Sequence, residues 1–159
     1  DMKIPGIIGG LGPETTAKIY LALAMKRSKT IRGILISNVS FPKFLEEEIA
    51  VKGKSPKLIL PYILKSIKQL ESAKADFIVL PCNTLHSLSY DIKESTNLEF
   101  LDLIETVSKQ IKSNYKKIGI LCSTKTKKDK LYDNQLEGNT DIIYPNKEGN
   151  LTLTLNNTQ

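Results

Sequence analysis

The chain has 159 residues, of which 40% are apolar and 25% charged, a balance that is ordinary for a globular protein of one or two domains. Its two cysteines exclude a disulfide framework and favour a reducing compartment. The net charge is +6, but only 6% of residues are aromatic and no nucleic-acid motif is present, which argues against a nucleic-acid partner. Neither an apolar run of about 18 residues nor a signal-like start occurs, so we expect a cytoplasmic protein with no membrane partner.

Short apolar runs bounded by turns alternate with amphipathic stretches along the chain. This pattern predicts strands that alternate with helices in a parallel sheet. The apolar runs are continuous, as expected of strands covered on both faces. The predicted strands span residues 4–8, 34–38, 77–80, 98–101 and 118–122, with 142–144 as a weaker sixth.

The segments between the strands show helical spacing of apolar residues. We expect these stripes to face the core, because residues three and four apart share one face of a helix. Pro56 fits a first helical turn, whereas Pro61 predicts a late helix start or a kink. The stripes are Ala17, Tyr20, Leu21 and Ala24; Leu60, Ile63, Leu64 and Ile67; and Leu103 or Ile104, Val107 and Ile111.

Three segments have no simple strand or helix assignment. Residues 40–55 are either a lid or a surface helix around KFLEEEIA followed by a turn at Gly53. The basic stretch KTKKDK at 125–130 is interpreted as a solvated face, with general attraction of anions, an acidic substrate included, as the alternative. Residues 146–159 are rich in Asn and Thr and predict a poorly ordered tail.

The first candidate site is a glycine-rich turn in GIIGGLGPETTAKIY, at residues 6–20. Glycines let the backbone approach a ligand closely, and the helix that follows presents unpaired N–H groups. The turn lacks the Lys-Ser/Thr of a P-loop and the spacing of G-x-G-x-x-G. By itself it predicts a tight turn between strand and helix, with a cradle for a carboxylate or phosphate as the alternative.

The second candidate site is the turn VLPCNTLHS, at residues 79–87. In an open parallel sheet, ligands bind outside the carboxyl ends of the strands, where Cys82, Asn83 and Thr84 would emerge beside the glycine turn. Nearby backbone N–H groups would favour the thiolate of Cys82 over the thiol. Asn83 and Thr84 would add neutral donors that hold a carboxylate without neutralising the thiolate.

His86, the only histidine, follows Cys82 by four residues. If the segment is helical, a Cys–His pair is one interpretation. The alternative is a histidine that caps or packs against the next helix, and we favour a supporting role. Two cysteines and one histidine in this arrangement do not predict a zinc site.

Together, these turns resemble the aspartate/glutamate racemase family of the Asp/Glu/hydantoin racemase superfamily. The resemblance rests on GIIGGLGPETTAKIY, on ADFIVLPCNTLH at 75–86 and on KIGILCSTKT at 117–126, and it extends to about residue 145. It implies two similar α/β lobes, with the site between them and with no pyridoxal phosphate or other cofactor. It also implies one cysteine from each lobe, one removing the α-proton and the other delivering a proton to the opposite face. Two groups are needed because a single base would restore the starting enantiomer.

On this sequence, Cys82 matches the family's first catalytic cysteine. The resemblance implies that Asn83 and Thr84 bind the α-carboxylate, and that Gly10 and Leu11 line the site. The implied substrate is an acidic amino acid, aspartate or glutamate.

The side-chain carboxylate of that substrate has no obvious partner. No arginine occurs in residues 40–55, where some aspartate racemases carry one, and by a gapless count Leu45 takes its place. Lys43 could substitute in part, as a point charge.

The family's second cysteine lies in a GCTE-like motif that has no counterpart here. Cys122 is interpreted as an apolar strand residue or a thiol at the edge of the site, with a role as the second base as the less favoured alternative. We therefore expect a first α/β lobe at 1–100, an incomplete second lobe at 101–145 and the tail at 146–159, a chain truncated relative to the family.

Without a closing lobe, we expect the face built by Ile104, Val107 and Ile118 to be partly uncovered, and a homodimer is a possible assembly. Racemisation would be impaired by the missing cysteine. The alternatives are a non-catalytic homologue that binds a small carboxylate, one-cysteine chemistry such as decarboxylation of a malonate-like acid, and a nucleotide-binding module, which the incomplete phosphate motifs disfavour.

Overall fold

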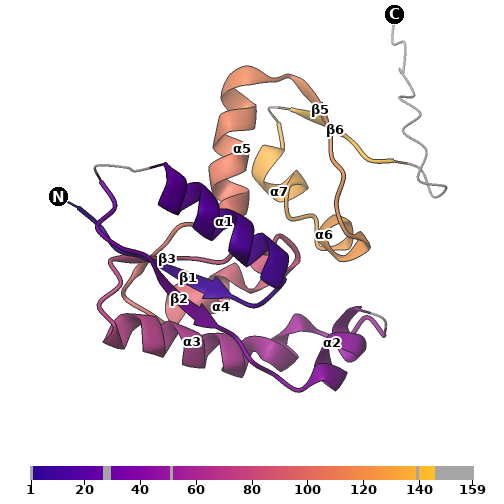
Figure 1. Cartoon of the computed structure of the whole chain (residues 1–159). Helices are drawn as coiled ribbons and strands as arrows, with labels where there is room; N and C mark the ends of the chain where they lie inside the picture. The colour runs from indigo at the N-terminus through magenta and orange to yellow at the C-terminus, as the bar shows by residue number, and fades with distance from the viewer. Residues whose placement is uncertain (1, 27–29, 51, 139, 146–159) are drawn as a thin grey trace, which may run out of the picture. The chain divides into compact units, whose positions relative to one another are not determined.

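In the computed structural model, which describes residues 2–26, 30–50, 52–138 and 140–145, every pair of neighbouring strands runs parallel. The chain divides into a first unit, Asp1–Leu103, and a second unit, Ile104–Gln159. Strands alternate with helices along the chain, which confirms the α/β class with a parallel sheet flanked by helices (Figure 1). The predicted tail at 146–159 lies outside the described residues.

The first unit is built on a four-stranded sheet with the order β2-β1-β3-β4. Each strand overlaps a predicted one and differs from it by one residue at one or both ends. The central strand β1 is buried along its whole length, as its continuous apolar and glycine run predicts. The strands are β1 (Pro5–Gly9), β2 (Leu35–Asn38), β3 (Phe77–Val79) and β4 (Glu99–Phe100).

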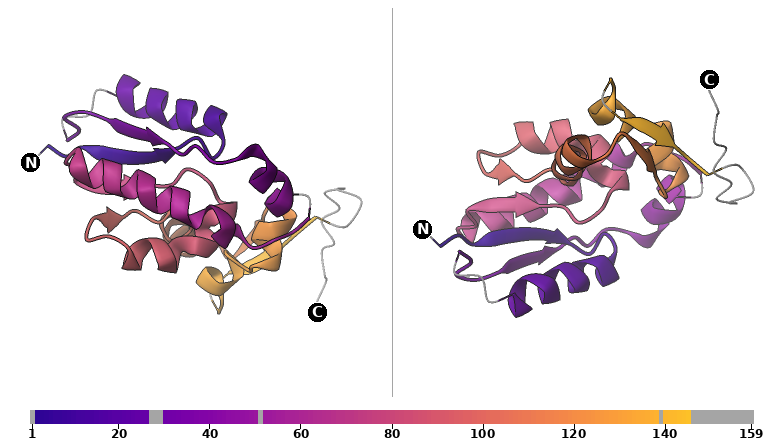
Figure 2. Two further views of the ribbon diagram at one scale, coloured as in Figure 1. Left: turned by 90° about the horizontal axis from the view of Figure 1, so that it is seen from below. Right: turned by 90° about the horizontal axis from the view of Figure 1, so that it is seen from above.

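The helices of this unit cover both faces of the sheet, with α1 on one face and α3 on the other (Figure 1); Figure 2 shows the same layers from two further sides. None of the helices in the described parts of the chain is long and apolar enough to cross a membrane. The helices are α1 (Pro13–Met25), α2 (Lys43–Ala50), η1 (Pro56–Ile59), α3 (Leu60–Ser72), η2 (Thr84–Leu88) and α4 (Ser89–Glu94), where η marks a 3-10 helix.

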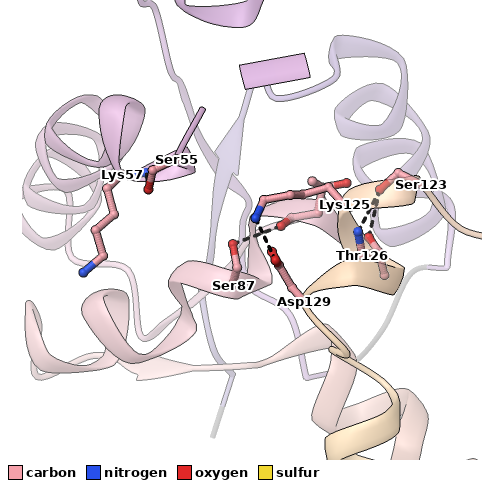
Figure 3. A network of polar contacts seen from close by, with 8 residues as sticks. Ser55, Lys57, Ser87, Ser123, Lys125, Thr126 and Asp129 are labelled. Carbon is pink, nitrogen blue, oxygen red and sulfur yellow. Dashed lines mark hydrogen bonds and ion pairs between the residues drawn. The ribbon is translucent and has the colours of Figure 1, made fainter. Parts of the chain in front are cut away.

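Two prolines mark the start of the third helical segment. Pro56 begins η1, which Ser55 caps by accepting a hydrogen bond from the N–H of Lys57 at 3.3 Å (Figure 3). Pro61 lies in the first turn of α3, which starts at Leu60. The late start is therefore confirmed, because proline in a first turn removes only an N–H that has no helical partner.

The segment 40–55 folds as the surface-helix alternative. Helix α2 covers the predicted KFLEEEIA, and Gly53 turns with a φ of 67°. Leu45 of this helix is 9% exposed and belongs to the core of the first unit.

The core of the first unit lies between the sheet and α3. Ile63 and Ile67 of α3 are buried against Ile78 and Leu80, and Leu60 and Leu64 pack beside them. The stripe predicted for this helix is therefore confirmed.

The stripe predicted for α1 is wrong. Tyr20 and Leu21 are 42% and 52% exposed, and Ala17 and Ala24 are also exposed. Thr16 is buried instead, where a Cβ on Gly9 would come within 2.7 Å of its methyl carbon. The helix is apolar on several sides, so its spacing fits more than one stripe, and close packing of Thr16 on Gly9 decides which side faces the strands.

The second unit pairs β5 with β6 in parallel and has a small core of its own. Ile104 is 4% exposed, and Val107 and Ile118 pack with it against Tyr132 and Leu136. The predicted partial exposure of this face is therefore wrong at Ile104, which the chain around α7 covers, whereas Val107 and Ile118 are only half-buried, as predicted. The elements are α5 (Leu103–Asn114), β5 (Lys117–Gly119), α6 (Thr124–Lys128), α7 (Asp133–Leu136) and β6 (Asp141–Ile143).

Polar contacts organise the basic stretch around α6. Ser123 caps this helix by accepting a hydrogen bond from the N–H of Thr126 at 3.2 Å, and Lys125 pairs with Asp129 at 2.7 Å (Figure 3). Lys127 lies over the ring of Tyr144, with Nζ 4.9 Å from the centroid. Two of the basic side chains therefore have partners within the second unit.

Replacing Ile78 by alanine is expected to lower the free energy of unfolding by about 2–5 kcal/mol, because Ile78 is 0% exposed at the centre of the sheet. The matched control is Ile36→Ala on the edge strand β2, where the side chain is 43% exposed and the expected loss is about 1 kcal/mol or less. Urea unfolding followed by circular dichroism measures both. Equal losses would contradict the assigned core.

Candidate functional site

The two candidate turns meet at the carboxyl edge of the sheet, because they follow neighbouring parallel strands. Pro5 of β1 pairs with Phe77 of β3, and Ile7 pairs with Val79. The same register, carried beyond the strands, would set Gly10 level with Cys82. Ligands of open parallel sheets bind at this edge.

The glycine turn is held in a single conformation by its neighbours. Gly10 has a φ of 85°, and a Cβ there would lie 2.6 Å from Oδ1 of Asn38 and 3.0 Å from the carbonyl oxygen of Val39. Its N–H donates to Oγ1 of Thr16 at 3.1 Å, and that hydroxyl donates to the carbonyl of Gly12 at 3.1 Å. Only glycine fits position 10, because both the positive φ and the close approach exclude a side chain.

Sequence reasoning missed two residues of this turn. Thr16 was not distinguished from its neighbours in the first turn of α1, although it supplies the hydroxyl that closes the loop. Asn38 was predicted only as the end of a strand. A polar residue at the carboxyl end of a strand next to β1 was a usable signal, because that edge is where ligands bind.

The cysteine turn begins directly after β3. Pro81 is buried, and the N–H of Cys82 donates to the carbonyl of Leu80 at 2.8 Å. The chain then enters η2, where the N–H of His86 donates to the carbonyl of Asn83 at 3.0 Å. Asn83 is exposed, whereas Cys82 and Thr84 are half-buried. The turn therefore presents a thiol, an amide and a hydroxyl on consecutive residues.

The pKa of the Cys82 thiol is raised above its ordinary value, because burial penalises the thiolate. The backbone N–H groups of Leu85 and Thr84 act in the predicted direction and lower the pKa, but their effect is smaller than that of burial. The prediction that the N–H groups favour the thiolate over the thiol is therefore wrong, because burial has the larger effect on the pKa. In the ligand-free protein at neutral pH, Cys82 is a thiol.

His86 lies in η2, within the cysteine turn, and is 4% exposed. Its Nδ1 is 2.8 Å from the carbonyl oxygen of Cys82, and its Nε2 accepts a hydrogen bond from the N–H of Leu103 at 3.0 Å. The ring stacks on Phe100, with 5.7 Å between the ring centroids. Burial lowers the pKa of the imidazole, although the Cys82 carbonyl and Asp102 act in the opposite direction. Both ring nitrogens are thus engaged by backbone groups.

Two further predicted residues lie in different surroundings. Leu11 packs against the same core cluster as Cys82. Lys43 is exposed at the first residue of α2, and no contact among the described residues joins it to the cysteine turn. Leu45, at the position where some related racemases are expected to carry an arginine, is part of the core.

Cys122 lies in the second unit, beyond the end of β5. With Ser123, Thr124, Lys127 and Tyr144 it lines a pocket of about 340 Å³. Burial raises the pKa of its thiol, whereas Lys127 lowers it. Cys122 is therefore a pocket-lining residue and not part of strand β5. No group of three His, Cys, Asp or Glu side chains in the described ranges could hold a metal ion.

A parallel sheet that brings a glycine turn and a cysteine turn together at its carboxyl edge defines an α/β protein with a thiol at its candidate site. The model of the Asp/Glu/Hydantoin racemase family matches residues 8–149, so the chain belongs to this family.

Known proteins extend this comparison. The chain is 24% identical over 139 residues to the broad specificity amino-acid racemase RacX of Bacillus subtilis (strain 168), a match that covers 84% of this chain and 60% of RacX. It also resembles the crystal structure of an aspartate racemase homologue from Pyrococcus horikoshii OT3, with a TM-score of 0.73, 25% identity and coverage of 92% of this chain and 66% of that one. For the aspartate racemase of Picrophilus torridus the TM-score is 0.73 and the identity 26%, with 92% and 64% of the two chains covered. The chain thus spans less than two thirds of the length of these relatives.

Replacing Gly10 by alanine is expected to destabilise the protein more than replacing Gly53. Both positions have positive φ, which costs an alanine about 1–2 kcal/mol, but only at Gly10 does a Cβ meet other atoms within 4 Å. The overpacking at Gly10 is expected to add about 1–3 kcal/mol. Urea unfolding of both variants measures the difference. Equal destabilisation would mean that Asn38 and Val39 move away from the added Cβ at little cost.

The raised pKa of Cys82 has a measurable consequence. In a Cys122→Ser variant, Cys82 is the only thiol, and its alkylation by iodoacetamide reports the thiolate fraction. We expect the rate to rise with pH through a midpoint above that of an exposed cysteine, because burial moves the pKa upward. A midpoint below that of a cysteine-containing reference peptide would show that the N–H groups outweigh burial.

Proposed function

We propose that Cys82 removes the α-proton of an acidic amino acid, in a racemase reaction of the aspartate/glutamate type that uses two thiols and no pyridoxal phosphate. The observation that carries the proposal is the position of the thiol at the carboxyl end of β3, in the turn that neighbours Gly10. Membership of the Asp/Glu/Hydantoin racemase family supports it.

The neighbouring residues would hold the substrate. Asn83 and Thr84 offer neutral donors to the α-carboxylate, on the two residues directly after the thiol. A carboxylate held in this way brings the α-carbon close to the sulfur. Because both donors are neutral, they place no positive charge beside the thiolate, where such a charge would stabilise it and make it a weaker base. The turn at Gly10 and Leu11 would form the neighbouring wall of the site, held in place by the close approach of Asn38 and Val39 to Gly10.

The proton transfer has a simple balance. The thiolate of Cys82 takes the proton, so the Cα–H bond breaks and an S–H bond forms, and the electron pair moves from Cα into the substrate carboxylate. The α-proton is only weakly acidic, so the reaction needs a well-aligned base. Burial makes the thiolate rarer but also more basic, which favours removal of such a proton.

Return of a proton to the opposite face requires a second acid. In our proposal, exchange of the α-proton with solvent needs only Cys82, whereas racemisation needs the partner thiol as well. The two reactions are therefore measured separately.

The choice of substrate would depend on the residues around α2. Lys43 is a point charge that could attract a side-chain carboxylate, but Leu45 is buried and can offer none of the contacts of an arginine. RacX, the relative from Bacillus subtilis, is named for its broad specificity. A substrate panel therefore includes alanine and lysine beside aspartate and glutamate.

A second candidate function is binding of a small carboxylate without catalysis. The protonated state of the ligand-free Cys82 thiol favours it, because a thiol can donate to a carboxylate but cannot act as a base. Calorimetric titration with aspartate, glutamate and succinate tests this alternative. Binding without proton exchange would favour it over the racemase proposal.

The racemase proposal is tested by exchange of the α-proton in deuterated water. Incubation of the protein with L- and D-aspartate and L- and D-glutamate is expected to cause loss of the α-proton signal in NMR spectra. Cys82→Ser should lower the exchange rate by at least about 100-fold, because a serine hydroxyl is a far weaker acid than a thiol and provides almost no base at neutral pH.

Cys122→Ser is the matched control, since it removes the other thiol from a different unit. It is expected to leave α-proton exchange close to that of the unchanged chain. Exchange that survives Cys82→Ser, or that is absent from a correctly folded chain for the whole panel, would refute the proposal.

A further inference from the structure

His86 makes a bridge between two backbone segments that are far apart in the sequence. One ring nitrogen contacts the carbonyl of Cys82, and the other accepts the N–H of Leu103, the last residue of the first unit. We propose that His86 is a positioning residue, whose imidazole fixes the backbone of Cys82 relative to the junction between β4 and α5. The inference deepens the proposed function, since it takes Cys82 as the reacting group.

The hydrogen bonds assign the tautomer of the ring. The carbonyl of Cys82 can only accept, so Nδ1 must carry the proton. The N–H of Leu103 can only donate, so Nε2 must be unprotonated. The bridge therefore requires a neutral imidazole with its proton on Nδ1, and neither ring nitrogen has a lone pair left to take a proton from the thiol. This geometry gives His86 a role through the backbone and not as the base of a Cys–His pair.

The bridge restricts the direction in which the thiol points. The N–H of Cys82 donates to the carbonyl of Leu80 at 2.8 Å, and its carbonyl accepts from His86 at 2.8 Å. With both backbone polar groups engaged, the Cα–Cβ bond has one direction, and the sulfur moves only by rotation about it. A thiol that must lie in line with an α-proton needs this restriction, since an error of about 1 Å can cost about 100-fold in rate.

The ring itself has little freedom to turn. It is 4% exposed and stacks on Phe100 of β4, with 24° between the ring planes. Two charged groups face it: Oδ1 of Asp102 lies 3.8 Å from Nε2, and Lys93 pairs with Oδ2 of the same carboxylate at 3.8 Å. Asp102 is therefore beyond hydrogen-bond distance from the ring, and the N–H of Leu103 is the group that Nε2 binds.

Because the chain has a single histidine, NMR can observe this bridge directly. Long-range ¹H–¹⁵N spectra distinguish a protonated ring nitrogen from an unprotonated one. We expect the protonated nitrogen to be Nδ1 in the unmodified protein at neutral pH. A ring with its proton on Nε2, or one that exchanges rapidly between the two tautomers, would overturn the proposal without any measurement of activity.

The effect on Cys82 is tested by alkylation with iodoacetamide in the Cys122→Ser background. His86→Phe keeps an aromatic ring against Phe100 but removes both hydrogen bonds. We expect the turn to loosen and expose the thiol, so that the midpoint of the rate against pH falls toward that of a free cysteine. At a fixed pH below the midpoint, the rate rises about tenfold for each unit of that fall.

His86→Asn is the matched variant, because its side-chain amide can donate from about the position of Nδ1 but cannot reach Leu103. It is expected to restore most of the slow alkylation of the parent, and the recovery identifies the contact with the Cys82 carbonyl as the one that matters. Circular dichroism verifies that both variants are folded. Should His86→Phe unfold, the comparison of His86→Asn with the parent and the NMR spectrum still decide the proposal.

The outcomes separate the inference from the proposed function. Alkylation profiles of folded His86→Phe and the parent that coincide would overturn the positioning role, whatever the protein catalyses. Conversely, an absence of α-proton exchange would refute the racemase proposal while leaving the tautomer and the alkylation profiles as evidence for the bridge. If exchange occurs, His86→Phe is expected to lower its kcat by up to about 100-fold with a smaller change in KM.

Discussion

The parallel pairing of β1 with β3 is the constraint on which the candidate site depends. The two strands are neighbours in the sheet although 67 residues separate the end of one from the start of the other. Their register brings the Gly10 turn and the Cys82 turn to the same edge of the sheet, because each turn follows the carboxyl end of its strand. Parallel strands must be joined by a crossover connection. The helices α1 to α3 therefore both connect β1 to β3 and cover the sheet.

At that edge, satisfying the backbone polar groups governs the local structure. The Thr16 hydroxyl accepts a hydrogen bond from the N–H of Gly10 and donates one to the carbonyl of Gly12. The His86 imidazole likewise donates to the carbonyl of Cys82 and accepts from the N–H of Leu103. In each case one buried polar side chain joins backbone groups of two different residues. Unpaired backbone groups are costly inside a protein, which explains why both side chains are more than nine-tenths buried.

Membership of the racemase family and the thiol at the sheet edge support one chemical interpretation, in which the first unit holds the base. The second unit has its own small core around Leu136 and its own pocket at Cys122. In the proposed reaction, removal of the α-proton needs only the thiol of Cys82, whereas racemisation also needs a second proton donor. Proton exchange and racemisation are therefore separate questions.

The sequence by itself determined the α/β class, the six strands to within a few residues at their ends, the late start of α3 and the identity of the two turns. These features depend on local signals: apolar runs, prolines, glycines and short motifs. The roles assigned to Cys82, Asn83, Thr84, Gly10, Leu11 and Lys43 came from the same motifs and stay predictions.

Only the tertiary structure decided which side of α1 packs on the sheet, since IYLALAM is apolar all round and the contact of Thr16 with Gly9 selects one face. It also decided the sign of the pKa shift at Cys82, because burial is a sum over neighbours from the whole unit and outweighs the two local N–H groups. The partner of His86 Nε2 lies 17 residues away at Leu103, and the cover for Ile104 comes from Tyr132 and Leu136. Such contacts depend on packing between distant segments, which no local pattern contains.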